Sequence, residues 1–398
     1  MIRLAALVLL ALIPADGEIV VLTNARILRV SGPEIANGTI VIEGGKIRRI
    51  GEKIDVPEGA KLIDLKGKTV IPGLIDGGCS IGVAGPLNED GEEVAPQVRI
   101  LDSLDPRSPD LIRARKTGVT AALVSPGNRG VIGGVSSIVK TAGDSRAGMI
   151  VREEAALKGS IGPIPTLGNF SPRGTAATFF ARRPTTRMGV AWEFRKAFFD
   201  AQRYREHHDE VDPGKEVLLR SLSGKLPIRI ASSRATDIET AMQIAEELNL
   251  SISFEEAQEA YKRADLLAAR KIPVLLRPVV IAPAVGNPEA SEIRLDAFSL
   301  LLQAGVKTAL LPVSDLRPEG LLASVAFAVR YGATRADALR AVTLTPAEIL
   351  GIADRLGSLE EGKDADLVIL SGNPEEITSR VESVMIDGRW VFGERAAK

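Results

Sequence analysis

The chain has 398 residues, of which 45% are hydrophobic and 25% are charged, and its formal net charge at pH 7 is −1. This is an ordinary globular composition, and the length accommodates an α/β barrel with a smaller module beside it. A net charge this close to zero gives no reason to expect nucleic acid or an anionic membrane as a partner. Cys79 is the single cysteine, so an intramolecular disulfide is excluded.

The chain begins with a short apolar run, residues 4–13, which follows Arg3 and precedes the small Ala15. A membrane-spanning helix needs about 20 apolar residues, so this run is too short, and its flanks are typical of a secretory signal peptide. We therefore predict a signal peptide over residues 1–16 and a secreted or periplasmic protein. A buried N-terminal strand is the alternative. No later stretch is long and apolar enough to span a membrane.

The two ends of the remaining chain carry β patterns. Residues 17–69 contain short apolar segments with a hairpin signal at Gly44-Gly45, and a module of this size cannot close a core alone. Near the C-terminus, Asp387-Gly388 separates two further apolar segments and is a strong hairpin signal. We therefore predict that residues 17–69 and 356–398 form one small β-sandwich.

Between these ends, residues 70–355 alternate apolar strand patterns with helical patterns. Such alternation predicts a TIM-like (β/α)8 barrel, so the fold class is α/β with a composite β domain. The stretch from Lys68 to Gly82 is the most informative. Its apolar residues are bounded by Pro, Gly and Asp76, which predicts a strand buried on both faces. Small residues follow at the C-terminal end of that strand, where α/β barrels build their sites.

Residues 72–76, Pro-Gly-Leu-Ile-Asp, resemble the strand-one signature of the amidohydrolase superfamily, which normally continues into His-x-His. Residues 357–368 are similar to its C-terminal signature. The resemblance is to the imidazolonepropionase-like and prolidase-like branch and covers nearly the whole mature chain. It implies a barrel that hydrolyses carbon–nitrogen bonds other than peptide bonds with a divalent metal such as zinc.

The resemblance also implies that the metal-binding histidines are lost. The corresponding positions carry Gly78 and Ser80 after the first strand, Ala231 and Ser233 after the fifth, and Glu256 after the sixth. The two histidines of the chain, residues 207 and 208, are adjacent at a predicted helix end and cannot chelate one metal. We therefore expect no cofactor, although carboxylates could still bind a hard cation through oxygen.

Three further residues are candidates for the site. The resemblance matches Asp315 to the aspartate that binds metal and takes a proton in active relatives, here vestigial, and Lys158 loosely to a lysine that can be carboxylated to bridge two metals. A buried pair of Lys158 with a carboxylate in the vacated metal space is the alternative. Arg234 is a candidate for holding an acidic ligand.

Two functions therefore stay open. One is a hydrolase of carbon–nitrogen bonds whose degenerate metal site lowers or abolishes activity. Zinc lowers the pKa of bound water from about 15.7 to about 7, roughly 12 kcal/mol, whereas a lone general base contributes about 10²–10⁴-fold. The other is a non-catalytic homologue, which binds a small molecule or serves as partner subunit of an active paralogue. A homo-oligomer and a hetero-oligomer are both compatible with the sequence.

Overall fold

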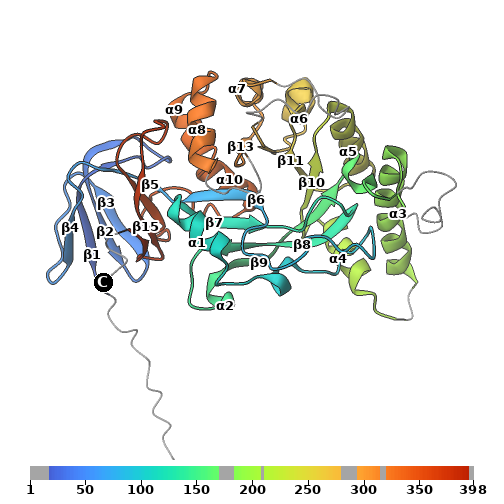
Figure 1. Ribbon diagram of the computed structural model, residues 1–398, viewed down its shortest axis with the longest axis horizontal. Helices are drawn as coiled ribbons and strands as arrows, with labels where there is room; N and C mark the ends of the chain where they lie inside the picture. Colours follow the sequence, from blue (N-terminus) through green and yellow to red (C-terminus); the bar gives the residue numbers. More distant parts are fainter. Residues whose placement is uncertain (1–17, 170–182, 208–209, 279–293, 314–319, 394–398) are drawn as a thin grey trace, which may run out of the picture.

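The computed structural model describes residues 18–169, 183–207, 210–278, 294–313 and 320–393. Two parts of the molecule lie side by side, a β domain and a larger barrel (Figure 1). The predicted signal peptide and Asp315 lie outside the described residues.

The β domain is built from both ends of the chain, and the fold prediction is confirmed. Its strands follow the order β16-β15-β14-β5-β1-β2-β3, with β4 paired to β1. Residues 69–72 and 367–370 pair as antiparallel strands, and this ladder joins the N-terminal to the C-terminal segment. The strands are β1 (Val20–Ile27), β2 (Ile35–Glu43), β3 (Lys46–Gly51), β4 (Lys61–Asp64), β5 (Thr69–Pro72), β14 (Leu367–Leu370), β15 (Val381–Ile386) and β16 (Arg389–Phe392).

The barrel has a second eight-stranded sheet, in the order β13-β12-β11-β10-β9-β8-β7-β6. Residues 341 and 342 help to close it, because their carbonyl oxygens accept hydrogen bonds from the N–H groups of Leu310 and Ile75 in the two edge strands. The strands are β6 (Leu74–Cys79), β7 (Val119–Val124), β8 (Ile132–Lys140), β9 (Ile150–Ser160), β10 (Ile228–Ser232), β11 (Ile252–Glu256), β12 (Val274–Leu276) and β13 (Thr308–Leu310).

One strand departs from regular β/α alternation. β8 runs antiparallel to both of its neighbours, β7 and β9, whereas the other neighbouring pairs in this sheet are parallel. Only a one-turn helix, α2 (Arg146–Met149), lies between β8 and β9. All nine residues of β8 are buried, so it serves as a core strand although no long helix connects it to β9.

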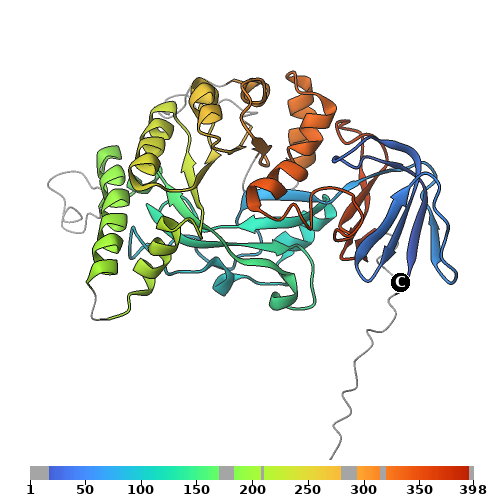
Figure 2. The same ribbon diagram turned by 180° about the vertical axis from the view of Figure 1, so that it is seen from behind.

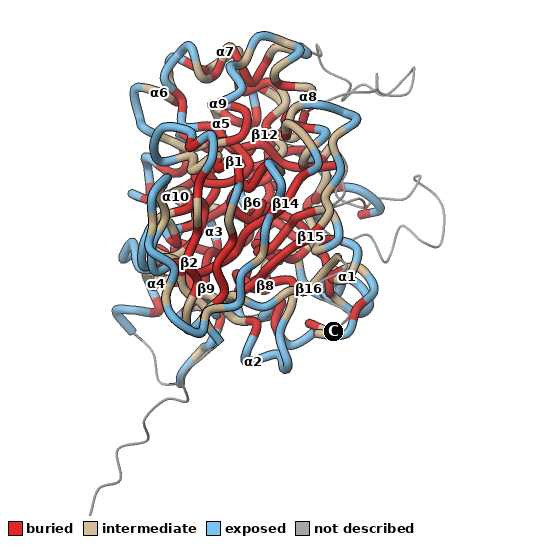
Figure 3. Tube along the Cα trace, turned by 90° about the vertical axis from the view of Figure 1, so that its left-hand side faces the viewer, coloured by how far each residue is buried: buried red, intermediate tan, exposed pale blue. Residues whose placement is uncertain are grey.

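Helices cover the outside of the barrel sheet on the side of β10 to β13 (Figures 1 and 2). The α-helices besides α2 are α1 (Pro109–Lys116), α3 (Arg187–Glu206), α4 (Pro213–Leu222), α5 (Ala235–Leu248), α6 (Ala264–Ala269), α7 (Ala297–Gln303), α8 (Leu321–Arg330), α9 (Arg335–Arg340) and α10 (Leu344–Leu350). Among the described residues, none of these helices combines the length and the apolar character needed to cross a membrane. Buried segments run through the centre of the molecule, with exposed turns at the rim (Figure 3).

A buried charge cluster joins the β domain to the barrel. Lys140, at the end of β8 and 2% exposed, places its ammonium 2.9 Å from Asp364 Oδ2 and 3.0 Å from Asp366 Oδ1, and it also pairs with Asp387. Burial raises the pKa of Asp366 to about 6, although the Lys140 ammonium opposes this shift. Burial disfavours the charge of Asp364 too, but hydrogen bonds from Lys46, Lys140 and Arg355 lower its pKa to about 2.

The raised pKa of Asp366 predicts a pH-dependent stability difference from the Asp366→Asn variant. The folded wild type holds this proton more tightly than the unfolded chain does, so the wild type gains stability relative to the variant as the pH falls through about 6 towards about 4, by up to about 3 kcal/mol. Urea unfolding of both proteins across this range measures the difference. The variant of an exposed aspartate, Asp354→Asn, is the control and should show no such trend. If the difference in unfolding free energy between wild type and Asp366→Asn stayed constant with pH, the raised pKa of Asp366 would be contradicted.

Candidate functional site

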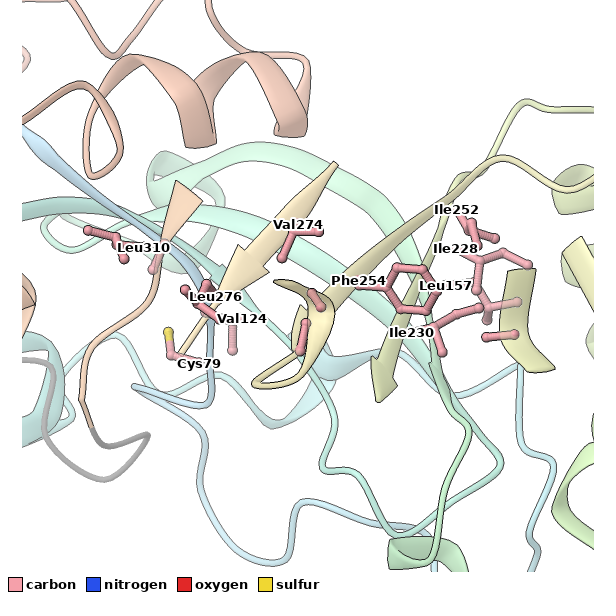
Figure 4. Packing of buried hydrophobic residues seen from close by; sticks show 14 of the residues in the cluster. Cys79, Val124, Leu157, Ile228, Ile230, Ile252, Phe254, Val274, Leu276 and Leu310 are labelled. Atoms are coloured by element: carbon pink, nitrogen blue, oxygen red, sulfur yellow. The ribbon is translucent and has the colours of Figure 1, made fainter. Parts of the chain in front are cut away.

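The register of the barrel strands determines which side chains face its interior. Leu157, Ile228, Ile230 and Phe254 belong to the cluster that also contains helix residues, so they face the helices (Figure 4). Side chains alternate between the two faces of a strand. Lys158 on β9, Arg229 on β10 and Glu255 on β11 occupy the alternate positions, and Lys158 and Arg229 are direct partners in the ladder. These three charged side chains therefore face the barrel interior.

Lys158 and Glu255 form an ion pair inside the barrel. Lys158 is 2% exposed and Glu255 is 5% exposed, so water screens the pair little. Arg229, also 2% exposed, donates from Nη1 to the carbonyl oxygen of Gly77 at 3.1 Å. Glu255 Oε2 and Arg229 Nε have no hydrogen-bond partner within the described part of the chain. The interior is therefore a charged space in which each buried group depends on its neighbours for neutralisation.

The glycines that follow Asp76 make room for these side chains. A Cβ atom added at Gly78 would lie 3.2 Å from Glu255 Oε2, and one added at Gly77 would lie 2.2 Å from Leu275 Cδ2. An imidazole at position 78 would therefore contact the Glu255 carboxylate directly. The glycine at position 78 and the place of the Glu255 carboxylate are therefore sterically linked.

Burial lowers the pKa of Lys158 to about 7. The Glu256 carboxylate raises it, while the charges of Arg229 and Arg277 lower it further. Burial also lowers the pKa of Arg229 to about 10, which leaves its guanidinium charged at neutral pH. The charge of Lys158 therefore changes near neutral pH.

Glu256 lies at the mouth and not opposite Gly78. Its backbone is left-handed, with φ of 66°, and its Oε2 accepts a hydrogen bond from Arg277 Nε at 2.8 Å. Arg277 Nη1 also donates to the carbonyl oxygen of Pro312 at 2.8 Å. The family resemblance put Glu256 at a histidine position after the sixth strand. In the structure, the carboxylate beside Gly78 is that of Glu255.

Among the described residues, the other predicted positions of the barrel lie at the ends of β6 and β10. Asp76 is fully buried, Oδ1 accepts from the Gly78 N–H at 3.1 Å, and burial raises its pKa. Ala231 is buried on β10, Ser233 follows that strand, and Arg234 directly precedes α5. Ser80 is half-buried just after β6. His207 ends α3 in the outer layer, so it takes no part in the interior.

The residues at the expected metal positions differ from what a zinc ion requires. Gly78, Ser80, Ala231 and Ser233 offer no imidazole, and Glu255 and Glu256 are each paired with a cation. Within the described ranges, no group of three or more His, Cys, Asp or Glu residues is placed to hold a metal ion. Structural and catalytic zinc sites use at least three protein ligands. The described residues do not fit a zinc site of the kind that the resemblance implied.

Sequence reasoning missed two of the interior residues, Arg229 and Glu255. A signal for both was present, because Arg229 is flanked by isoleucines and Glu255 follows Phe254 in segments that otherwise predict fully buried strands. A charged residue inside such a segment is rare unless it is paired. Pairing the two strands in register would have placed both charges on the inner face.

Comparison with known proteins agrees with the fold. The amidohydrolase family model matches residues 290–391. The crystal structure of an amidohydrolase from Thermotoga maritima superposes with a TM-score of 0.87 at 33% identity, covering 94% of this chain and 100% of that one.

Two curated proteins are also similar in sequence. Amidohydrolase tasK from Hapsidospora irregularis is 27% identical over 90% of this chain, which spans 40% of the length of tasK. An imidazolonepropionase from Thermoplasma acidophilum is 24% identical over 84% of this chain and 83% of its own length. With one relative of known structure matched along its full length at 33% identity, the chain belongs to the amidohydrolase family.

Proposed function

We propose that this chain is a non-hydrolytic member of its family, which binds a small molecule or a partner subunit and does not cleave a carbon–nitrogen bond. One observation supports this most directly: the Glu255 carboxylate, paired with Lys158, lies against Gly78. The charge pair thus occupies the space next to a position where the resemblance implies a metal ligand.

The electrostatics of the interior support the same proposal. A divalent cation beside Lys158 would face the ammonium of that residue and the guanidinium of Arg229 at short range, in a medium that screens charge poorly. It would also take the Glu255 carboxylate away from Lys158, and breaking a buried ion pair costs about 3–5 kcal/mol. Metal binding therefore requires Lys158 to lose its charge first.

Because metal binding requires an uncharged Lys158, a second function stays open. With a pKa of about 7, Lys158 is neutral in a large share of molecules at and above neutral pH. A neutral amine is the form that reacts with carbon dioxide to give a carbamate, which would reverse the charge at this position. Together with Glu256 and Asp315, a carboxylated Lys158 would offer the oxygen ligands that hard cations prefer. A low hydrolytic activity on carbon–nitrogen bonds other than peptide bonds would follow from that state.

For the non-hydrolytic function, the side chains that bind a small ligand lie at the mouth of the barrel. Arg234 precedes α5 at the end of β10, and Glu256 and Arg277 form a half-buried pair at the end of β11. We assign Arg234 to the acidic part of a small ligand because a guanidinium can hold a carboxylate through two parallel hydrogen bonds. An oligomer with a second copy or with an active paralogue is compatible with this assignment.

The proposal predicts little bound metal. Protein purified without a histidine tag, incubated with zinc and bicarbonate and then dialysed, should contain clearly less than one zinc per chain by inductively coupled plasma mass spectrometry. The physical reason is that Glu255 already forms an ion pair with Lys158, and Glu256 with Arg277. One or two tightly held metal ions per chain would refute the non-hydrolytic proposal in favour of the carboxylated state.

A second prediction concerns the stability of the interior pair. Lys158→Met and Glu255→Gln should each lower the free energy of unfolding by about 3–5 kcal/mol, because each leaves one charge buried without its partner. The double variant should recover much of this loss, since replacing both members of a buried pair is often near neutral. A double-mutant cycle measured by urea unfolding gives the coupling, provided that the transition is two-state.

The pair of Lys196 and Asp200 on α3 is the matched control, because its members are four residues apart on one helix and its lysine side chain is 50% exposed. Its coupling should be about 0.3–0.5 kcal/mol. Additive effects at Lys158 and Glu255 would mean that the two side chains do not neutralise each other, and the central observation of the proposal would be lost.

A further inference from the structure

Lys158 and Arg229 lie side by side on the inner face of the barrel, and only Lys158 has a carboxylate partner. The two residues are direct partners in the ladder between β9 and β10, and neighbouring strands lie about 4.8 Å apart. Lys158 pairs with Glu255. Arg229 pairs with no carboxylate among the described residues, and its buried Nε has no hydrogen-bond partner there. With Lys158 protonated, these three side chains carry one net positive charge, which a small anion beside Arg229 would compensate.

Gly78 leaves room beside the ion pair. Apart from its chain neighbours, a Cβ atom added at Gly78 would have two atoms of the described residues within 4 Å, Glu255 Oε2 at 3.2 Å and Leu311 Cδ2 at 3.8 Å. Glu255 Oε2 itself has no hydrogen-bond partner within the described ranges. Ser80, two residues further along, is half-buried, so this side of the interior leads towards the mouth. A small polar molecule in this space would lie against the Glu255 carboxylate.

The amine of Lys158 has two properties that suit it to react with a carbonyl group. Burial, together with the charges of Arg229 and Arg277, lowers its pKa to about 7, so the neutral, nucleophilic form is present near neutral pH. The carboxylate of Glu255 is in contact with it and can take and return protons during the reaction. Lys140, also buried, differs in the first property, because the carboxylates around it raise its pKa in spite of burial.

We propose that Lys158 forms a Schiff base with a small 2-oxo acid, whose carboxylate pairs with Arg229 on the adjacent strand. Lys158 first transfers a proton to Glu255. The neutral Nζ then attacks the carbonyl carbon, and the carbonyl oxygen takes the proton from Glu255 as the C–N bond forms. The nitrogen gives a proton back to Glu255, which passes it to the new hydroxyl group. The C–O bond breaks, water leaves, and a protonated imine remains opposite the Glu255 carboxylate. No oxidant or reductant is needed.

The charge of the product fits this interior. The protonated imine keeps the positive charge of the lysine, so the ion pair with Glu255 persists, and the carboxylate of the 2-oxo acid compensates Arg229. A carbamate on Lys158 would instead place a second negative charge beside Glu255 unless a metal ion were also bound. The inference rests on the proposed non-hydrolytic function, because it requires a Lys158 that holds neither carbon dioxide nor a metal. It adds a contact to the one assigned to Arg234, since Arg229 lies within β10 and Arg234 after it.

Reductive trapping with pyruvate as the probe tests the reaction. Sodium cyanoborohydride reduces a protonated imine to a stable secondary amine, so pyruvate leaves one carboxyethyl group on the reacting lysine. The protein is incubated with both compounds at pH 7 and digested, and the modified lysines are quantified by peptide mass spectrometry. Lys158 should be modified at least about tenfold more than the exposed Lys116, because an amine of ordinary pKa is almost entirely charged at pH 7. Lys158→Arg keeps the charge opposite Glu255 without a primary amine, and it should abolish this product.

A neutral ketone and the zinc content of the same sample complete the test. Methyl pyruvate has the ketone without the charge, so relative to Lys116 it should modify Lys158 at least about tenfold less than pyruvate does. Modification of Lys158 no greater than that of Lys116 would overturn the Schiff base, and equal modification by methyl pyruvate would overturn the pairing with Arg229. An unmodified Lys158 in zinc-free protein would overturn this inference alone, whereas one or two zinc ions per chain would overturn the non-hydrolytic proposal with it.

Discussion

The ion pair between Lys158 and Glu255 is the constraint on which the barrel interior depends. A lysine that is 2% exposed is stable in the charged form only if a carboxylate lies beside it. The carboxylate of Glu255 can take that place because residue 78 is a glycine. Arg229, in register with Lys158, then extends to the carbonyl oxygen of Gly77. Gly78 and the charged interior thus form one arrangement, in which the Glu255 carboxylate lies against the backbone of β6.

The molecule has a second buried lysine, and the comparison explains what differs at Lys158. Burial opposes the charge of both. Lys140 lies among the carboxylates of Asp364, Asp366 and Asp387, and these raise its pKa in spite of burial. At Lys158, burial lowers the pKa to about 7, and the positive charges of Arg229 and Arg277 add to this shift against the opposing Glu256 carboxylate. Lys140 therefore stays charged at the junction near neutral pH, whereas the charge of Lys158 changes with pH in that range.

Much of the fold could be predicted from the sequence. The hairpin at Asp387-Gly388 and the short β-segments before residue 70 predicted the composite β domain, and the pairing of β5 with β14 confirms it. The turn residues and the spacing of apolar side chains indicate these strands and hairpins. The antiparallel run of β8 was not predicted, because strand direction depends on the paths of the connecting segments and not on the composition of the strand.

The site was predictable only in part. Lys158 was named from the sequence with its carboxylate partner left open, and Glu255, which forms the ion pair, was not singled out. The left-handed backbone at Glu256 turns the end of β11 towards Arg277, and no pattern in the sequence indicates that turn. The long reach of Arg229 to Gly77 likewise depends on the width of the barrel, which is a property of the closed sheet.

The most direct test of the account is a crystal structure of the protein grown with zinc and bicarbonate, with diffraction data collected on both sides of the zinc absorption edge. The account predicts no anomalous peak between β6, β9 and β11. It also predicts an unmodified Lys158 side chain in contact with Glu255. An anomalous peak in that space, with Lys158 carboxylated and Glu255 turned away, would contradict the claim that an ion pair has replaced the metal.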